Sequence, residues 1–506
     1  MFKFGTDTLT LNRIDQLTNG TLKGEITTAV RKRINTSRKT VENLAKGAQA
    51  VYGINTGFGP LCDTKISEAE TGQLQRNLLL SHAVGVGKPI SKSLSKMMLI
   101  CKIHALCQAH SGVRLSLIET LIYWLDNDLI PVVPEQGSVG ASGDLAPLAH
   151  LFLPLLGEGE FWVSDRCVPA KNILTKFQRM PLALEAKEGL ALINGTQFIL
   201  AHAIQGLQRM AYLLDLADVA GAMSLEGAQG SQAPFKKELH QLRPFRGNIK
   251  VAERLRTLVK DSENMASHND CDRVQDPYSL RCMPQVHGAS RNAWSHLEEL
   301  VNIEMNAVTD NPVIINNKEA ISGGNFHGQS LAMALDYITL AAAELGNIAD
   351  RRCYLLLENK NGLPRLLTQH AGLNSGMMIP QYTTAALVTE NKTLCFPASA
   401  DSIPTSLGQE DHVSMGSISG RKFNQVLDNL EKIFAIELLY GAQAISFRRP
   451  LKCSDFIEHN LKLIRTKVPK LEDDRLMKND IDQLITIVQQ QQIVVDDIAM
   501  GITTKM

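Results

Sequence analysis

The chain has 506 residues, of which 44% are hydrophobic, and it carries 52 basic and 52 acidic side chains. A chain of this length can bury a large core, and a formal net charge of zero provides no general attraction to nucleic acids. The N-terminus lacks the basic start and apolar stretch of a signal peptide, and no stretch of eighteen uninterrupted apolar residues suggests a membrane span. We therefore expect a cytoplasmic protein without nucleic-acid or membrane partners.

The cysteines and histidines give no sign of a metal site. The nine cysteines are odd in number and contain no C-x-x-C pair, which argues against a disulfide framework and a thiolate zinc site. The thirteen histidines lack the H-E-x-x-H spacing that places two imidazoles on one helix face. We expect reduced thiols and no metal.

In chain order, the basic residues between Arg31 and Lys39 are expected on a solvated helix face. Proline is absent between positions 181 and 234, 312 and 364, and 404 and 450, so long helices can run there unbroken. The span 198–226 is apolar nearly all round, and apolar residues recur at helical spacing over 329–358. Such helices belong to the centre of a bundle or of an oligomer.

Strand-like alternation is limited to short pieces such as 131–133 and 313–315. We therefore predict an all-α fold. Its expected parts are an N-terminal part over 1–200, a central long-helix bundle over 201–450 and a C-terminal helical tail over 451–506.

The most informative segment is 137–150, with the sequence GSVGASGDLAPLAH. Gly143 has no Cβ, so its nitrogen can approach the Ala141 carbonyl closely, and Ser142 between them has one hydroxyl to lose. Ring closure and two dehydrations would leave an imidazolinone with an exocyclic methylidene, an electrophile that needs no added cofactor. A plain structural turn is the alternative, because neither the P-loop nor the G-x-S-x-G nucleophile elbow is matched.

This segment resembles the signature of the aromatic amino acid ammonia-lyases, which form the 4-methylideneimidazol-5-one (MIO) group from Ala-Ser-Gly. The resemblance implies a carbon–nitrogen lyase whose cofactor is generated from Ala141, Ser142 and Gly143, with no metal or dissociable cofactor. It also implies an aspartase/fumarase-like helical bundle and a homotetramer whose active sites draw residues from more than one subunit.

Residues 51–60, VYGINTGFGP, are rich in turn-forming residues and are expected to form a loop. They are similar to the flexible lid of the family, whose tyrosine is assigned as the catalytic base. A phenol has a pKa near 10, which nearby positive charge or hydrogen bonds would have to lower. We predict Tyr52 as the base that removes the β-proton, with Tyr278 and Glu410 as the alternatives.

Two polar residues predict the substrate. His82 closes an apolar helical stretch, and without the resemblance it reads equally well as a core or capping histidine. In family members that act on histidine it lies beside the substrate ring. The segment QEDHVSMG at 409–416 can likewise be interpreted as a capped, solvated helix start. In the family, however, a glutamate at the position of Glu410 accompanies histidine as the substrate. The resemblance thus implies conversion of L-histidine to trans-urocanate and ammonia, the first step of histidine degradation. The preceding TSLG at 405–408 departs from the TSAN of many relatives.

The remaining matches concern substrate binding. Tyr278 and Arg281 share a face if a helix begins after a proline at 277. The resemblance makes Arg281 the clamp for the substrate carboxylate, Tyr278 a hydroxyl that assists proton transfer and Gln275 the residue that steadies both. It assigns the Asn194 amide to the substrate carboxylate and the MIO carbonyl, and it lays the Phe326 ring against the MIO pocket.

Other functions remain open. A tyrosine or phenylalanine ammonia-lyase, or an aminomutase that returns the amine to the β-carbon, would use the same electrophile, although His82 and Glu410 argue against them. A serine hydrolase would need the Ser142 hydroxyl intact, and in a non-catalytic helical assembly the loop would never cyclise. Intact mass separates these classes, since MIO formation removes two waters.

Overall fold

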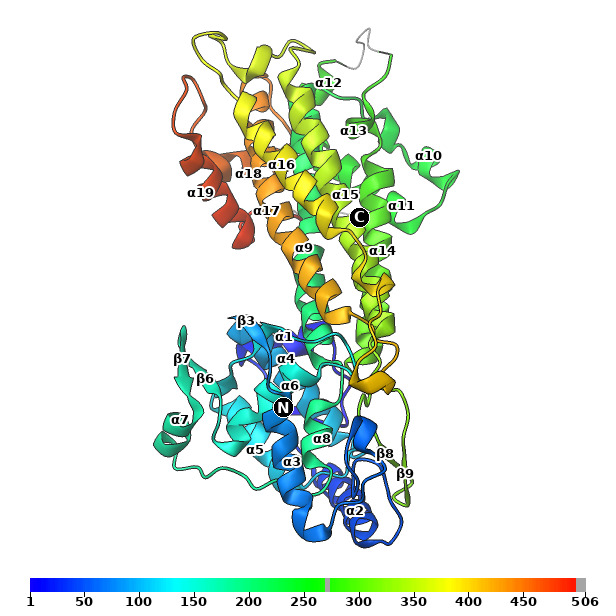
Figure 1. Cartoon of the computed structure of the whole chain (residues 1–506). Coiled ribbons are helices and arrows are strands. Elements are labelled where there is room, and N and C mark those ends of the chain that lie inside the picture. Colours follow the sequence, from blue (N-terminus) through cyan, green and yellow to red (C-terminus); the bar gives the residue numbers. More distant parts are fainter. Residues whose placement is uncertain (269–273, 497–506) are drawn as a thin grey trace. The chain divides into compact units, whose positions relative to one another are not determined.

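The computed structural model describes residues 1–268 and 274–496 (Figure 1). They form two compact units that do not follow chain order. The first unit combines Met1–Gln205 with Glu298–Leu335 and Pro397–Arg421. The second combines Gly206–Leu297 and Asp336–Phe396 with the described chain from Lys422 onward. The predicted division into three consecutive parts follows chain order and stays a prediction.

The first unit holds short and medium helices together with all the strands of the described residues. Its helices are α1 (Leu11–Asn19), α2 (Thr28–Lys46), α3 (Glu68–His82), α4 (Lys92–Cys107), α5 (Leu115–Asp126), α6 (Leu145–Phe152), α7 (Ala170–Lys176) and α8 (Glu188–Ile193). Its strands are β1 (Phe2–Lys3), β2 (Gly24–Glu25), β3 (Val86–Pro89), β4 (Ile130–Pro131), β5 (Pro134–Gln136), β6 (Glu160–Val163), β7 (Arg166–Pro169), β8 (Val313–Ile315) and β9 (Glu319–Ile321).

The second unit is helical. It contains α10 (Lys237–Gln241), α11 (Arg246–Leu258), α12 (Glu263–Ala266), α13 (Tyr278–Arg281), α16 (Met378–Leu394), α18 (Asp455–Arg465) and α19 (Met477–Gln489). Four longer helices have residues in both units: α9 (Gln197–Ala228), α14 (Met283–Glu304), α15 (Gln329–Leu357) and α17 (Gly416–Ser446). The predicted all-α class is confirmed.

Three of the long helices, α9, α15 and α17, lie within the three spans that lack proline, as predicted. Glycines on α9 let it pack closely against other long helices. A Cβ added to Gly221 would lie 2.5 Å from the sulfur of Met283 on α14, and one added to Gly227 would lie 2.6 Å from Ala444 on α17. Among the described residues, α15 alone is long and apolar enough to cross a membrane, and 67% of its most apolar window is buried. That burial is the one expected of a core helix.

The strands form small sheets of two or three strands. β6 pairs antiparallel with both β4 and β7, β3 pairs antiparallel with β5, and β1 pairs parallel with β2. β8 and β9 form a hairpin in which Val313 faces Ile321. The strand-like piece expected at 313–315 is β8, whereas the piece expected at 131–133 overlaps β4 only at Pro131.

One expectation for α2 is wrong. Lys32, Arg33 and Lys39 are exposed, but Arg38 is buried. Its guanidinium donates to the Ala186 carbonyl at 2.9 Å and to the Glu185 carboxylate at 2.5 Å. A charged side chain can be buried when its donors are paired in this way, and a run of basic residues in the sequence does not reveal such partners.

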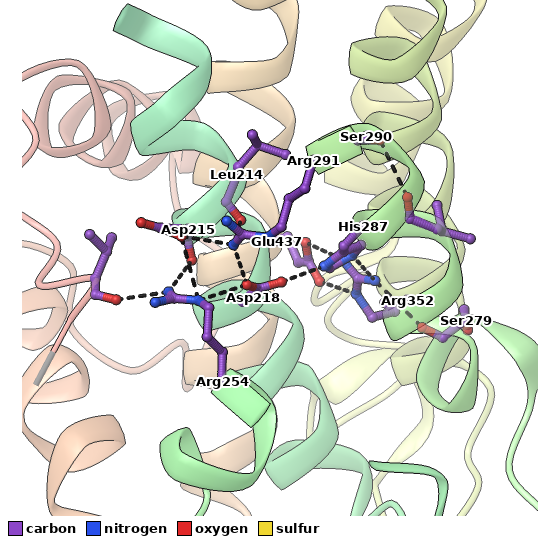
Figure 2. Close-up of polar contacts among 12 residues, drawn as sticks. Leu214, Asp215, Asp218, Arg254, Ser279, His287, Ser290, Arg291, Arg352 and Glu437 are labelled. Atoms are coloured by element: carbon purple, nitrogen blue, oxygen red, sulfur yellow. Dashed lines mark hydrogen bonds and ion pairs between the residues drawn. The ribbon is translucent and has the colours of Figure 1, made fainter. Parts of the chain in front are cut away.

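The second unit contains a buried charge cluster (Figure 2). Asp218 is fully buried and accepts hydrogen bonds from His287 Nδ1 at 2.8 Å, Arg254 Nε at 2.8 Å and Arg291 Nη2 at 2.5 Å. Burial alone would raise the pKa of this carboxyl, but Arg291, His287 and Arg254 together lower it to about 2. Removing one partner would leave an uncompensated buried charge, which destabilises strongly.

His104 on α4 makes the stability of the first unit sensitive to acid. It is 3% exposed, and its Nδ1 accepts a hydrogen bond from the Gly5 N–H at 3.3 Å. Burial lowers its pKa from 6.5 to about 4. The unfolded chain therefore binds a proton from about pH 6.5 downward, whereas the folded chain resists protonation until about pH 4.

We expect the free energy of unfolding to fall as the pH drops from 6.5 to 4, by at most about 3 kcal/mol from this group. His104→Gln keeps an acceptor for Gly5 but does not titrate, so its loss of stability over this range should be smaller. Urea denaturation at several pH values measures the difference. An identical pH dependence in the variant would show that His104 does not contribute.

Candidate active site

A cavity of about 460 Å³ lies in the first unit. Five of the predicted site residues line it: Tyr52, His82, Ser142, Asn194 and Glu410. Most of the other lining residues are apolar, and they include Phe58, Leu61, Leu74, Leu78, Leu145, Leu190 and Ile193. Segments up to 358 residues apart in the sequence thus place polar groups in one apolar cavity, which is typical of a small-molecule site.

The turn at Ala141–Gly143 has the geometry that close backbone approach requires. Ser142 and Gly143 both have left-handed backbones, with φ of 51° and 80°. A Cβ on Gly143 would lie 2.2 Å from the Gly195 carbonyl oxygen, so no other residue fits without a shift of the backbone. Ala141 is buried. These residues fit the cyclisation chemistry that forms MIO.

Asp144 anchors this turn, and it was not predicted as a site residue. It is fully buried, and its carboxylate accepts hydrogen bonds from the Phe198 and Ile199 N–H groups, both at 3.0 Å, and from Ser138 Oγ at 3.1 Å. Burial raises its pKa to about 7, although these hydrogen bonds oppose the rise. Asp144 thereby ties the turn to the first residues of α9.

Glu410 is held by three hydroxyls. Its Oε1 accepts a hydrogen bond from Ser142 Oγ at 2.8 Å. Its Oε2 accepts hydrogen bonds from Thr405 Oγ1 at 2.9 Å and Ser406 Oγ at 2.8 Å. The carboxylate therefore has a fixed orientation, with one oxygen directed at the residue that is predicted to become the electrophile.

The loop that carries these hydroxyls is the one that departs from the pattern of many relatives. Ser406, Leu407 and Gly408 all have left-handed backbones, with φ of 50°, 54° and 86°. Leu407 is 95% exposed. A leucine costs free energy in this backbone region. The hydroxyls that hold Glu410 come from Thr405 and Ser406, so the departure at 407–408 leaves the carboxylate contacts in place.

His82 is the last residue of α3, as predicted, and Ser81 Oγ lies 3.0 Å from its Nδ1. Burial lowers the pKa of the imidazole, while the Leu78 carbonyl and the Glu410 carboxylate oppose this shift. The ring is therefore largely neutral at neutral pH and presents one donor and one acceptor nitrogen.

Tyr52 lies in a loop, as predicted, with its ring edge-on to Phe58 at a centroid distance of 6.5 Å. Burial raises the pKa of the phenol, the Gly59 backbone lowers it, and the Glu410 carboxylate raises it further. None of the residues that line the cavity is a lysine or an arginine. The positive charge that a tyrosine base requires is thus missing from the cavity wall of the first unit, and the role of Tyr52 stays a prediction.

Asn194 follows the last residue of α8 and is 2% exposed. Its Nδ2 donates to the Asn311 carbonyl at 3.0 Å, and its own carbonyl accepts a hydrogen bond from Lys102 Nζ. Lys102 is a second residue that the sequence analysis missed. A signal was present, because this lysine stands inside the apolar stretch MMLICKIHALC of α4.

Phe326 is half-buried in the loop that follows β9, and it is not among the residues that line the cavity. The same loop is held at Gly323, whose N–H donates to Asn311 Oδ1 at 2.8 Å. The positioning role of Phe326 therefore stays a prediction.

Gln275, Tyr278 and Arg281 belong to the second unit. Helix α13 begins directly after Pro277 and places the Arg281 guanidinium over the Tyr278 ring, 4.4 Å from its centroid, so the predicted shared face is confirmed. Arg281 Nε donates to the Asp276 carbonyl at 2.9 Å, and Tyr278 is 71% exposed.

The buried charge cluster of the second unit reaches α13 (Figure 2). Arg352 is fully buried and ion-paired with Glu437, and its Nη1 lies 3.5 Å from the Ser279 carbonyl between Tyr278 and Arg281.

Within the two described ranges, no group of three or more histidine, cysteine, aspartate or glutamate side chains is arranged to hold a metal ion.

Comparison with known proteins identifies the family of the chain. The family profile "Aromatic amino acid lyase" matches residues 9–466. A histidine ammonia-lyase of Myxococcus xanthus is 45% identical over 489 residues, which are 96% of each chain, and one of Sorangium cellulosum is 47% identical over 92% of each chain.

Solved structures of related enzymes share the fold. Histidine ammonia-lyase from Trypanosoma cruzi superposes with a TM-score of 0.88 at 40% identity, covering 97% of this chain and 94% of that one. Tyrosine aminomutase from Streptomyces globisporus gives 0.91 at 32% identity, covering 97% of both. The chain belongs to the aromatic amino acid lyase family.

Proposed function

We propose that the protein acts as a histidine ammonia-lyase and converts L-histidine to trans-urocanate and ammonia. The observation that carries this proposal is that His82 and Glu410 line the same apolar cavity as Ser142. Loss of the Ser142 hydroxyl on MIO formation leaves Glu410 Oε1 without its hydroxyl donor, while Thr405 and Ser406 still hold Oε2. Oε1 can then accept a hydrogen bond from an imidazole N–H, which a phenyl ring does not offer. Relatives named histidine ammonia-lyase, at 45% and 47% identity, support the same substrate. Action in the cytoplasm stays an expectation.

The cofactor of this reaction is MIO, formed from Ala141, Ser142 and Gly143. The left-handed turn and the contact between Gly143 and Gly195 support its formation. MIO supplies an electrophile that makes the substrate amine a better leaving group.

The other residues bind the substrate and move its proton. His82 and Glu410 hold the imidazole ring, and the Asn194 amide donates to the substrate carboxylate. The base that removes the β-proton is Tyr52, with Tyr278 and Glu410 as the alternatives. For Tyr52 to act, a cation must approach the phenol and offset the burial that raises its pKa.

The cavity is completed by another copy of the chain. An amino acid substrate carries a carboxylate, yet no lysine or arginine lines the cavity of the first unit. Arg281 is the predicted clamp and belongs to the second unit. Exposed apolar side chains on α15 and α16 of that unit support self-association, namely Tyr337, Leu340, Ile379 and Tyr382. We infer a homotetramer in which Gln275, Tyr278 and Arg281 reach a cavity of a neighbouring subunit.

The direct test is product formation from L-histidine, L-tyrosine and L-phenylalanine, measured in parallel by ultraviolet absorbance. Urocanate from histidine alone is expected. Cinnamate or coumarate would overturn the proposed substrate. A β-amino acid detected by chromatography would instead identify an aminomutase, which the structural similarity to tyrosine aminomutase makes a necessary control.

Subunit mixing tests the shared site. Arg281→Ala should raise the KM for histidine severely but leave the mass loss of two waters intact, whereas Ser142→Ala should lack the electrophile. At a histidine concentration far below the raised KM, each variant alone should show little activity. When the two are co-expressed, we expect activity to return, because roughly a quarter of the sites combine an intact Ser142 with an intact Arg281 if subunits mix at random. Co-purified mixed oligomers without activity would show that one chain supplies both residues.

A further inference from the structure

A cluster of buried charges lies behind the cavity wall in the first unit. It consists of Lys102 on α4, Lys187 before α8, Asp144 and Asp310, each at most 5% exposed. Lys187 Nζ pairs with Asp310 Oδ2 at 2.7 Å. The cluster contains two basic and two acidic groups, and pairing of opposite charges lowers the free-energy cost of burying them.

Lys102 is the member of the cluster that contacts a predicted substrate-binding residue. Its Nζ donates to the carbonyl oxygen of Asn194, at the C-terminal end of α8. A cation is favoured at this end of a helix because the last carbonyls have no partners within the helix. Burial lowers the pKa of Lys102 to about 7, while Asp310 and Asp144 oppose the shift. An apolar residue in α4 would avoid this cost, so packing alone does not explain a lysine here.

Asn194, which Lys102 contacts, is adjacent in sequence to a residue that contacts the turn Ala141–Gly143. The next residue, Gly195, accepts a hydrogen bond at its carbonyl from the Asp144 N–H at 2.8 Å. It also forms a backbone bridge with Gly143. The Asn194–Gly195 segment therefore contacts the turn Ala141–Gly143 through Gly195. Through its side chain, the same segment is bound to Asn311, because Asn194 Nδ2 donates to the Asn311 carbonyl.

We propose that Lys102 is a positioning residue whose ammonium group fixes the backbone carbonyl of Asn194 and thereby holds two groups in place. One is the Asn194 amide at the cavity, and the other is Gly195 against the turn that cyclises. The inference rests on the proposed function, since it requires Asn194 to bind substrate and the turn to form MIO. It goes further in assigning a role to a residue outside the cavity.

Lys102→Met tests this role because it keeps most of the side-chain volume but leaves the Asn194 carbonyl without its donor. We expect the KM for L-histidine to rise roughly 10- to 100-fold, the loss associated with a hydrogen bond to a charged group, with a smaller change in kcat. We also expect a smaller fraction of chains that have lost two waters at a fixed time after synthesis. Lys102→Gln retains an N–H donor and should recover part of both effects.

Lys96→Met is the matched control. Lys96 lies on the same helix, but its ammonium group pairs with Asp128 at 3.0 Å, whereas that of Lys102 donates to Asn194. Its substitution should leave both KM and the mass distribution unchanged. An equal change in the two lysine variants would show a general effect of disturbing α4.

A double-mutant cycle separates positioning from a purely structural role. In an Asn194→Ala background, Lys102→Met should raise KM by less than about threefold. The backbone carbonyl at position 194 remains there, but the side-chain amide that binds the substrate is gone. Independent, multiplicative effects would overturn the inference, as would an unchanged KM and complete maturation in Lys102→Met. A wild-type protein with its full-length mass and no turnover would instead defeat the proposed function.

Discussion

Ser142→Ala should lower the turnover of L-histidine by roughly 10³-fold or more, which corresponds to about 4 kcal/mol of lost transition-state stabilisation. The substitution removes the hydroxyl that must be lost for the electrophile to form, while the small alanine fits the left-handed turn no worse than serine. Intact mass should show the change directly: the wild-type chain is two waters lighter than its sequence, and the variant is not.

Ser81→Ala is the control for this experiment. Ser81 lines the same cavity, and its hydroxyl lies 3.0 Å from His82 Nδ1. This variant should keep the two-water mass loss and most of its turnover. If Ser142→Ala keeps full activity, the reaction does not pass through Ser142, and a wild-type chain of full-length mass would return attention to the hydrolase and binding alternatives.

Glu410→Gln should reduce kcat/KM for L-histidine by up to about 10⁴-fold. Glutamine has nearly the same shape, but it carries no charge and directs an N–H₂ group where Glu410 offers an acceptor. The kcat/KM for L-phenylalanine should change far less, so the ratio of the two values measures selection. Steady-state kinetics with both substrates gives that ratio.

Asp411→Asn is the control for Glu410, since Asp411 is the adjacent carboxylate and is exposed. It should leave selection unchanged. The two-water mass loss should be determined for Glu410→Gln as well, because Ser142 Oγ donates to Glu410. A variant that matures fully and still prefers histidine would remove Glu410 from substrate selection.

Much of the fold could be predicted because its signals are local. The absence of proline and the helical spacing of apolar residues located α9 and α15 to within a few residues of their ends. Pro277 likewise indicated the start of α13. Local signals could not predict that 298–335 and 397–421 join the first unit, because that depends on contacts between segments far apart in the chain.

The same distinction holds for the site. The resemblance brought Tyr52, His82, Ser142, Asn194 and Glu410 together, and the structure places all five around one cavity. Sequence patterns say little about the environment of each group, and burial raises the pKa of Tyr52 where its predicted role needs a lower one.

The residues that were missed are buried polar groups. Lys102 and Asp144 have no periodic pattern, and their partners are backbone groups of other segments. A backbone carbonyl or N–H is present at every position, so the sequence does not mark which ones they are. The hydroxyls of Thr405 and Ser406 are a milder case, since they are close in sequence to Glu410 and only the backbone of the loop turns them toward it.

Because the first unit is assembled from segments far apart in the chain, its active site can form only late in synthesis. Glu410 and its loop belong to the same unit as Ser142, 268 positions earlier in the chain. A ribosome adds roughly 5–20 residues per second. Synthesis therefore reaches Glu410 and its loop many seconds after it has passed the turn Ala141–Gly143. The nascent N-terminal segment therefore cannot carry a finished active site, and a chain that terminates before residue 397 would lack part of the wall at any time.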